Sequence, residues 1–403
     1  MTNRSNIRKK VLLIEPNYSN KFPPVGLMKI ATYYRNLGNW DVVFYKGDLK
    51  LFVIERIADK LIDTLNDTDT SEINWHLYKD ILVDYIRTRR IFLLDSLPLD
   101  KTDCLLLKGL IIDAKDYYWR GIWKNKSERE WDRVGVTTLF TFYWQITIDT
   151  INFAKDLVKD ENNLMVGGVL ASIQPEELRK EIGDKVHIHV GILHSGDLDK
   201  GDTQNIDELE LDYSILDEVN YVYPMSNAYY RYTTRGCVRH CPFCAVPILE
   251  PVYQSYIPLK KRIDHIKEKY GEQKDLLLMD NNVLASDDFP KIINEIIDSG
   301  FKKGAKFFQP NLLKIAIRNL NVGINDPAYI RKSWRLIQEF YKSLKGEDSY
   351  NVYCIIEHYH IDKLLTCTKQ NLINAYDELK DIYSKQHKRV QGKLRFVDFN
   401  QGV

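Results

Sequence analysis

The chain is poor in cysteine, with only six in 403 residues. A small secreted protein held together by disulfide bonds needs a much higher share, so the sequence argues against a disulfide framework and favours a reducing, cytoplasmic location. An excess of one charge is missing too, because 57 Lys and Arg residues are balanced by 56 Asp and Glu residues. This balance argues against a protein that is held to nucleic acid by its overall charge.

Long apolar runs are also absent from the sequence. There is no stretch of about 18 uncharged apolar residues, which argues against a membrane-spanning helix. The first apolar run, 11–14, is too short for the core of a signal peptide and is stopped by Glu15 and Pro16. No short-period repeat or low-complexity tract is found. The length and the 44% of hydrophobic residues favour two or three globular domains.

Strand-like and helix-like patterns alternate in the first half of the chain. The predicted strands are 10–16, 40–45, 133–142, 164–169 and 186–192, and the predicted helices are 27–37, 146–158 and 175–182. Because strands that alternate with helices form a parallel sheet, residues 8–200 are expected to form a Rossmann-like, doubly wound α/β domain. A charged stretch at about 48–130 interrupts the pattern, and we interpret it as a mostly helical insertion.

A second βαβ series follows a polar linker at 201–228. Its predicted strands are 229–234, 275–279 and 395–400, and its predicted helices are 256–269 and 288–299. A second charged, helix-rich insertion, at about 302–392, separates the last strand from the other elements. The second domain is therefore expected to span 229–403.

Three of the six cysteines lie within eight residues of one another. Cys237, Cys241 and Cys244 have the spacing C-x3-C-x2-C and follow the predicted strand 229–234. Three thiolates on one tight loop can hold three irons of a [4Fe–4S] cubane and leave the fourth iron open to an outside ligand. A structural zinc site needs a fourth protein ligand, and His240 is poorly placed because it is adjacent to Cys241. The remaining cysteines, Cys104, Cys354 and Cys367, are isolated on other elements.

The loop 234–245, with Phe243 just before its last cysteine, resembles the signature of the radical SAM superfamily. The resemblance implies that Cys237, Cys241 and Cys244 hold a [4Fe–4S] cluster and that Phe243 packs near the adenine of S-adenosylmethionine. The open iron then binds S-adenosylmethionine through its amino and carboxylate groups. Reductive cleavage gives a 5′-deoxyadenosyl radical for hydrogen abstraction or methyl transfer. An electron donor such as flavodoxin or ferredoxin is implied, and the substrate is unknown.

Two further segments extend the resemblance. Family members form a full or partial (β/α) barrel, and residues after the second strand contact the amino group of S-adenosylmethionine. Asp280, Asn281 and Asn282 occupy this place and offer oxygen acceptors, although an ordinary Asx turn is the alternative. The segment 396–402 is similar to the third barrel strand, and its Asn400 and Gln401 are expected to face a ligand.

The N-terminal domain resembles the cobalamin-binding-type domain of class B radical SAM proteins. The similarity comes from 23–28 and from 166–172, whose glycines allow a cofactor to approach the backbone. The cobalt-binding motif D-x-H-x-x-G is absent, because none of the nine histidines has the required Asp and Gly. The resemblance therefore implies a doubly wound domain followed by a partial radical SAM barrel, with two helix-rich insertions, and it supports cobalamin only weakly.

Other interpretations of the chain stay open. Relatives continue with several more strands after the position of Val403, so we expect a truncated or split protein whose barrel a partner chain completes. A non-catalytic or split cluster-binding protein that needs a partner is one alternative function, and a zinc-binding interaction module is another. His358 and His360 lie two residues apart near Cys354 and Glu357, and a solvated strand face is favoured there over a metal site.

Overall fold

The computed structural model describes residues 8–68, 73–99 and 104–302. The chain divides into two compact units. The first comprises 1–226, 230–262 and 277–299, and the second comprises 227–229, 263–276 and 300–403. The predicted strand 395–400 with Asn400 and Gln401, and the histidine pair His358 and His360, lie outside the described residues.

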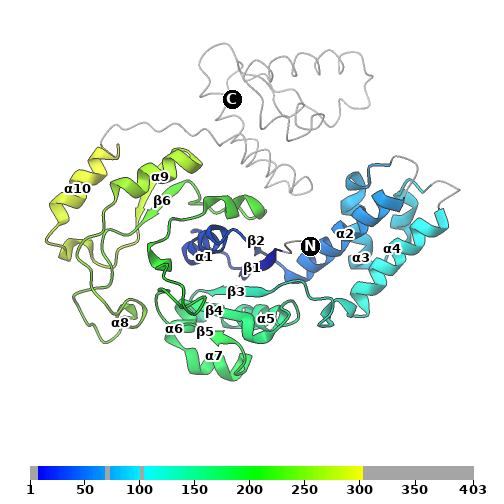
Figure 1. Ribbon diagram of the computed structural model, residues 1–403, viewed down its shortest axis with the longest axis horizontal. Helices are drawn as coiled ribbons and strands as arrows, with labels where there is room; N and C mark the ends of the chain where they lie inside the picture. Colours follow the sequence, from blue (N-terminus) through cyan, green and yellow to red (C-terminus); the bar gives the residue numbers. More distant parts are fainter. Residues whose placement is uncertain (1–7, 69–72, 100–103, 303–403) are drawn as a thin grey trace, which may run out of the picture. The chain divides into compact units, whose positions relative to one another are not determined.

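A five-stranded sheet forms the centre of the first unit (Figure 1). Its strand order is β2-β1-β3-β4-β5, and every pairing is parallel. This order is one of the two common orders of doubly wound α/β sheets. The predicted parallel α/β sheet is therefore confirmed. The strands are β1 (Lys9–Glu15), β2 (Trp40–Lys46), β3 (Arg133–Thr138), β4 (Leu164–Gly168) and β5 (His187–Ile188).

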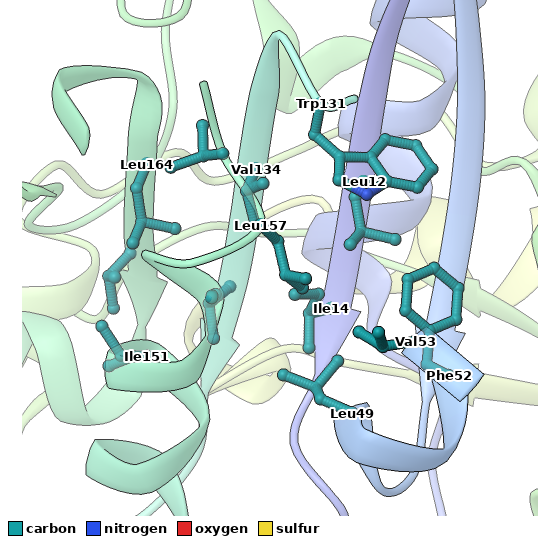
Figure 2. Packing of buried hydrophobic residues seen from close by; sticks show 14 of the residues in the cluster. Leu12, Ile14, Leu49, Phe52, Val53, Trp131, Val134, Ile151, Leu157 and Leu164 are labelled. Atoms are coloured by element: carbon teal, nitrogen blue, oxygen red, sulfur yellow. The ribbon is translucent and has the colours of Figure 1, made fainter. Parts of the chain in front are cut away.

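Helices connect the strands and cover both faces of the sheet. Successive side chains of a strand point to opposite faces, so Leu12 and Ile14 share one face of β1. Both belong to a core with residues of α2, α5 and α7, part of which Figure 2 shows. Helix α1 packs on the sheet with buried residues that are not part of this core. The connecting helices are α1 (Val25–Asn36), α5 (Trp144–Ala154), α6 (Val169–Ile173) and α7 (Pro175–Ile182).

Three predicted strands extend well beyond the observed ones. The strand predicted at 229–234 ends at Arg231. The strand predicted at 133–142 ends at Thr138, because Thr141–Tyr143 forms a 3-10 turn. Phe140 and Phe142, which resemble strand residues in the sequence, are 53% and 73% exposed. The strand predicted at 186–192 pairs over only two residues, since it lies at the edge of the sheet. Local apolar pattern does not reveal where a partner strand ends.

The first insertion is helical, as predicted. It contains α2 (Leu49–Thr68), α3 (Lys79–Thr88) and α4 (Cys104–Trp119), joined by the 3-10 turns η1 (Trp75–Tyr78), η2 (Ile91–Ser96) and η3 (Ile122–Lys124). These helices enclose a core of their own around Trp75, Leu82 and Ile111, all completely buried. Among the helices of the described ranges, none has both the length and the apolar character that crossing a bilayer requires.

The second βαβ series is present in its first part. It comprises β6 (Ala228–Arg231), α8 (Val246–Leu249), α9 (Lys260–Tyr270), β7 (Asp275–Leu278), η8 (Val283–Ala285) and α10 (Phe289–Asp298), after the 3-10 turns η6 (Ile206–Glu208) and η7 (Tyr213–Glu218) of the linker. Strands β6 and β7 form a two-stranded sheet. The amides of Asp275 and Met279 donate to the carbonyls of Asn227 and Arg231, so the strands are parallel and end at the same edge.

The two glycines at the end of β4 have different surroundings, which shows which of them is needed for packing. Gly168 has a φ of +108°, and a Cβ there would lie 2.4 Å from the carbonyl oxygen of Thr138. Gly167 has only ordinary contact, at 3.9 Å, with His189. The glycine at 168 is therefore required by the close approach of β4 to β3.

We expect Gly168→Ala to lower the free energy of unfolding by about 3 kcal/mol or more, because strained backbone and a backbone clash combine. Gly167→Ala is the matched control and should change it by less than about 1 kcal/mol. Urea denaturation of the full chain measures both. Equal losses in the two variants would contradict the packing role of Gly168.

Candidate functional site at the cysteine loop

The three clustered cysteines lie on one loop that follows β6. All three are free and partly exposed. The amide of Cys244 donates to the carbonyl oxygen of Cys241 at 3.0 Å, which closes a tight turn between them. The sulfur of Cys237 accepts a hydrogen bond from the backbone N–H of Arg239 at 3.4 Å. The loop therefore presents its thiols at the surface of the first unit.

The described ranges hold no group of three or more His, Cys, Asp or Glu side chains close enough to bind one metal ion. A single zinc ion gathers its ligands around one centre. A cubane cluster takes one thiolate per iron, so its cysteines lie farther apart than the ligands of a single ion. His240, considered above as a fourth zinc ligand, is exposed.

A glycine directly before the first cysteine is required by steric contact. Gly236 has a φ of +65°, and a Cβ there would lie 2.6 Å from the carbonyl oxygen of Val252 and 2.9 Å from that of Glu250. The segment that follows the loop runs antiparallel to it, since Arg235 and Gln254 exchange two backbone hydrogen bonds of 3.0 Å. The backbone before Cys237 is thus fixed against this returning segment.

Asp280 ties the start of the loop to the end of β7. Its Oδ1 accepts hydrogen bonds from the Thr233 N–H at 3.0 Å and hydroxyl at 2.8 Å, and from the Thr234 hydroxyl at 2.7 Å and N–H. Both threonines are completely buried. These contacts give Asp280 a positioning role, and the cofactor contact expected from the sequence stays a prediction.

The two asparagines after Asp280 lie beside the loop. The amide of Asn281 donates to Glu250 Oε2 at 2.8 Å, while Asn282 Nδ2 lies 3.9 Å from the sulfur of Cys237. The structure thus brings the segment 280–282 next to the first cysteine, which is 45 residues away from Asn282 in sequence. Within 280–282, Asn282 is the residue whose side chain contacts a cysteine sulfur.

Phe243 projects from the loop. Its side chain is 92% exposed, although phenylalanine is usually buried in folded proteins. It contributes nothing to a core of the first unit, and its predicted contact with adenine stays a prediction.

A chain of buried and half-buried charges supports the start of the loop. Lys29 of α1 contacts Asp207 Oδ1 at 2.6 Å. Arg235 donates to Asp207 through Nε at 3.1 Å and to Glu250 through Nη1 at 2.6 Å. Glu250 Oε2 in turn accepts the backbone N–H of Gly236 at 2.8 Å. Two positive and two negative side chains therefore alternate from the first helix to the residue before Cys237.

The charges in this chain sustain one another. Burial alone would raise the pKa of Asp207, but Lys29 and Arg235 outweigh it and hold the pKa below its ordinary value. Burial lowers the pKa of Lys29 to about 8, so this side chain is still protonated at neutral pH. The guanidinium carbon of Arg235 also lies 3.4 Å from the ring centroid of Tyr232, a cation–π contact.

Sequence reasoning missed this charge chain. Lys29 and Asp207 are 178 residues apart, and Asp207 and Arg235 are 28 apart, so no local pattern joins them. Lys29 carries one usable signal, because it stands between the buried Met28 and Ile30. A lysine at an apolar position of a helix predicts a buried ionic partner.

The ends of β1 and β2 are closed by tyrosines of the linker. Glu15 and Lys46 form an ion pair of 3.1 Å, and both side chains are at most 1% exposed. Tyr223 donates its hydroxyl to Glu15, and the ring centroid of Tyr221 lies 4.4 Å from the Lys46 ammonium. Burial raises the pKa of Glu15 and lowers that of Lys46, against their mutual attraction. These two tyrosines of the linker thus serve packing.

No family model, no curated protein and no solved structure matches the chain. The cysteine loop and its supporting residues are therefore the basis for a proposed function.

We expect Asp280→Ala to destabilise the loop strongly, because the buried N–H groups of Thr233 and Thr234 lose their acceptor. The free energy of unfolding should fall by about 3 kcal/mol or more. Asn281→Ala is the matched neighbour, and its single exposed hydrogen bond predicts a loss under about 1 kcal/mol. Thermal and urea unfolding measure both, and a tolerated Asp280→Ala would refute the positioning role.

Gly236→Ala should also distort the loop, since left-handed backbone and contact with two carbonyls act together. We expect a loss of about 3 kcal/mol in unfolding free energy. Gly201→Ala provides the control, because Gly201 has a φ of +91° but open space around its Cβ position. There only the backbone cost of about 1 kcal/mol should appear. Similar losses at 201 and 236 would show that the contact with Glu250 and Val252 is unimportant.

Proposed function

We propose that the chain is a radical SAM enzyme that binds a [4Fe–4S] cluster through Cys237, Cys241 and Cys244. The single observation that carries the proposal is the C-x3-C-x2-C loop, whose start is fixed by Asp280 while its thiols stay free and partly exposed. Cys237, Cys241 and Cys244 would hold this cluster, which would supply the electron for reductive cleavage of S-adenosylmethionine. The resulting 5′-deoxyadenosyl radical would be used for hydrogen abstraction or methyl transfer on an unknown substrate.

The donor set fits a cluster of this kind. Three free thiols on one loop leave a fourth iron without a protein ligand, which cluster chemistry with an outside ligand requires. The backbone N–H of Arg239 donates to the Cys237 sulfur and so helps to hold this sulfur in place. Exposure of the cysteines gives S-adenosylmethionine and an electron donor such as flavodoxin or ferredoxin access to the loop.

The residues around the loop have distinct tasks in this proposal. Asp280 and Asn281 hold Thr233, Thr234 and Glu250, so they position the loop. Asn282, beside Cys237, is the residue that accepts from the amino group of S-adenosylmethionine. The exposed ring of Phe243 stacks near the adenine.

Cobalamin is not part of the proposal. The cobalt-binding motif is absent, and the glycine at 168, which suggested room for a cofactor, is explained by its contact with Thr138. The methyl-transfer branch of the proposal therefore has less support than hydrogen abstraction. We propose a cytoplasmic enzyme, since a reduced cluster and free thiols require a reducing environment.

Anaerobic reconstitution with iron and sulfide tests the proposal. The protein should take up about four irons per chain and show a cluster signal that S-adenosylmethionine perturbs. With a reductant it should release 5′-deoxyadenosine. Cys237→Ala, Cys241→Ala and Cys244→Ala should each lose cluster and product, whereas Cys104→Ala should keep both.

The alternatives give different results in the same experiment. Colourless protein with one zinc would contradict the proposal and support the zinc-binding module. A cluster that S-adenosylmethionine does not perturb would favour the non-catalytic, partner-dependent protein. Loss of the cluster in Cys104→Ala would mean that the ligand set is wrong.

A further inference from the structure

A buried hydroxyl near the cysteine loop has no partner. The Oη of Tyr253 is inaccessible to solvent and makes no hydrogen bond within the described part of the chain. Buried polar groups are almost always paired, so an unpaired one requires an explanation. The nearest tyrosine in sequence, Tyr256, differs, because its hydroxyl donates to Glu295.

The backbone places Tyr253 opposite Gly236, the residue before the first cysteine. The next residue, Gln254, is paired with Arg235 in an antiparallel bridge, so Tyr253 comes opposite Gly236. The carbonyl of the preceding residue, Val252, is a group that a Cβ at Gly236 would strike. Tyr253 is therefore held next to the start of the cysteine loop.

Two ionisable groups interact electrostatically with the Tyr253 hydroxyl. Burial raises the pKa of Tyr253, and Asp287 and Cys237 raise it further. Asp287 is exposed and is therefore hydrated by solvent. The thiol of Cys237 is only partly exposed and becomes a strong acceptor once it is a thiolate.

Donors already converge on Cys237. Its sulfur accepts the N–H of Arg239 at 3.4 Å and lies 3.9 Å from Asn282 Nδ2. Arg239 belongs to the loop and Asn282 to the segment after β7. A donor from the returning segment would be the third at this sulfur.

We propose that Tyr253 is a positioning residue whose hydroxyl donates a hydrogen bond to the Cys237 thiolate of the loaded enzyme and thereby raises the reduction potential of its cluster. The inference rests on the proposed function and deepens it. Reduction adds negative charge to the cluster, and a hydrogen bond to a ligating sulfur stabilises that charge.

Potentiometric titration of the reconstituted full chain, followed by EPR, tests this inference. Tyr253→Phe removes only the hydroxyl and should disfavour reduction about tenfold, which is 59 mV more negative for one electron. Tyr256→Phe is the matched control on the same segment and should leave the potential unchanged. Iron and sulfide content should equal that of the unmodified chain in both variants.

A second variant keeps the inference testable if Tyr253→Phe does not assemble a cluster. A fluorinated tyrosine at 253 keeps the ring and the hydroxyl but is a stronger donor, so it should shift the potential in the positive direction. An unchanged potential in either variant would overturn the inference and would indicate that the hydroxyl serves Asp287 instead.

The two proposals fail in distinguishable ways. A normal cluster in the unmodified chain, with a potential that does not respond to changes at Tyr253, overturns the inference alone. Absence of a cluster from the unmodified chain overturns both.

Discussion

The largely buried ion pair between Asp207 and Arg235 is the interaction on which the cysteine loop depends. Arg235 stands two residues before Cys237, and it is held by Asp207 on one side and Glu250 on the other. Removing one partner of a buried pair costs about 3–5 kcal/mol, because the remaining charge loses its compensation. Lys29 extends the pair to α1. The position of the loop is thus set by the same charges that join the first helix to the linker.

A second constraint acts from the other side of the loop. Asp280 fixes Thr233 and Thr234, and Gly236 allows the backbone to touch the returning segment. The base of the loop is therefore buried and fully bonded, while its cysteines remain partly exposed. A rigid base with an open tip suits a site that binds a ligand with preset geometry, because little ordering has to occur on binding.

Local pattern was sufficient for the elements and for the cysteines, but not for the residues that hold them. Helix 175–182 and the first two strands follow from periodicity, and the three thiols follow from spacing. The end of β3 did not follow from periodicity, because the exposed Phe140 and Phe142 are residue types that are typical of strands. The role of Asp280 was missed because its partners lie 46 and 47 residues away. Contacts of this kind depend on the fold, which local sequence does not encode.

In the proposed enzyme, three protein thiolates hold a four-iron cluster whose fourth iron is open. Mössbauer spectroscopy of the iron-enriched cluster, with and without S-adenosylmethionine, is the sharpest test of this ligand set. One iron should differ from the other three, and its signal alone should move when S-adenosylmethionine is added. Four irons that are all unaffected by S-adenosylmethionine, or a chain that binds zinc in place of iron, would contradict it.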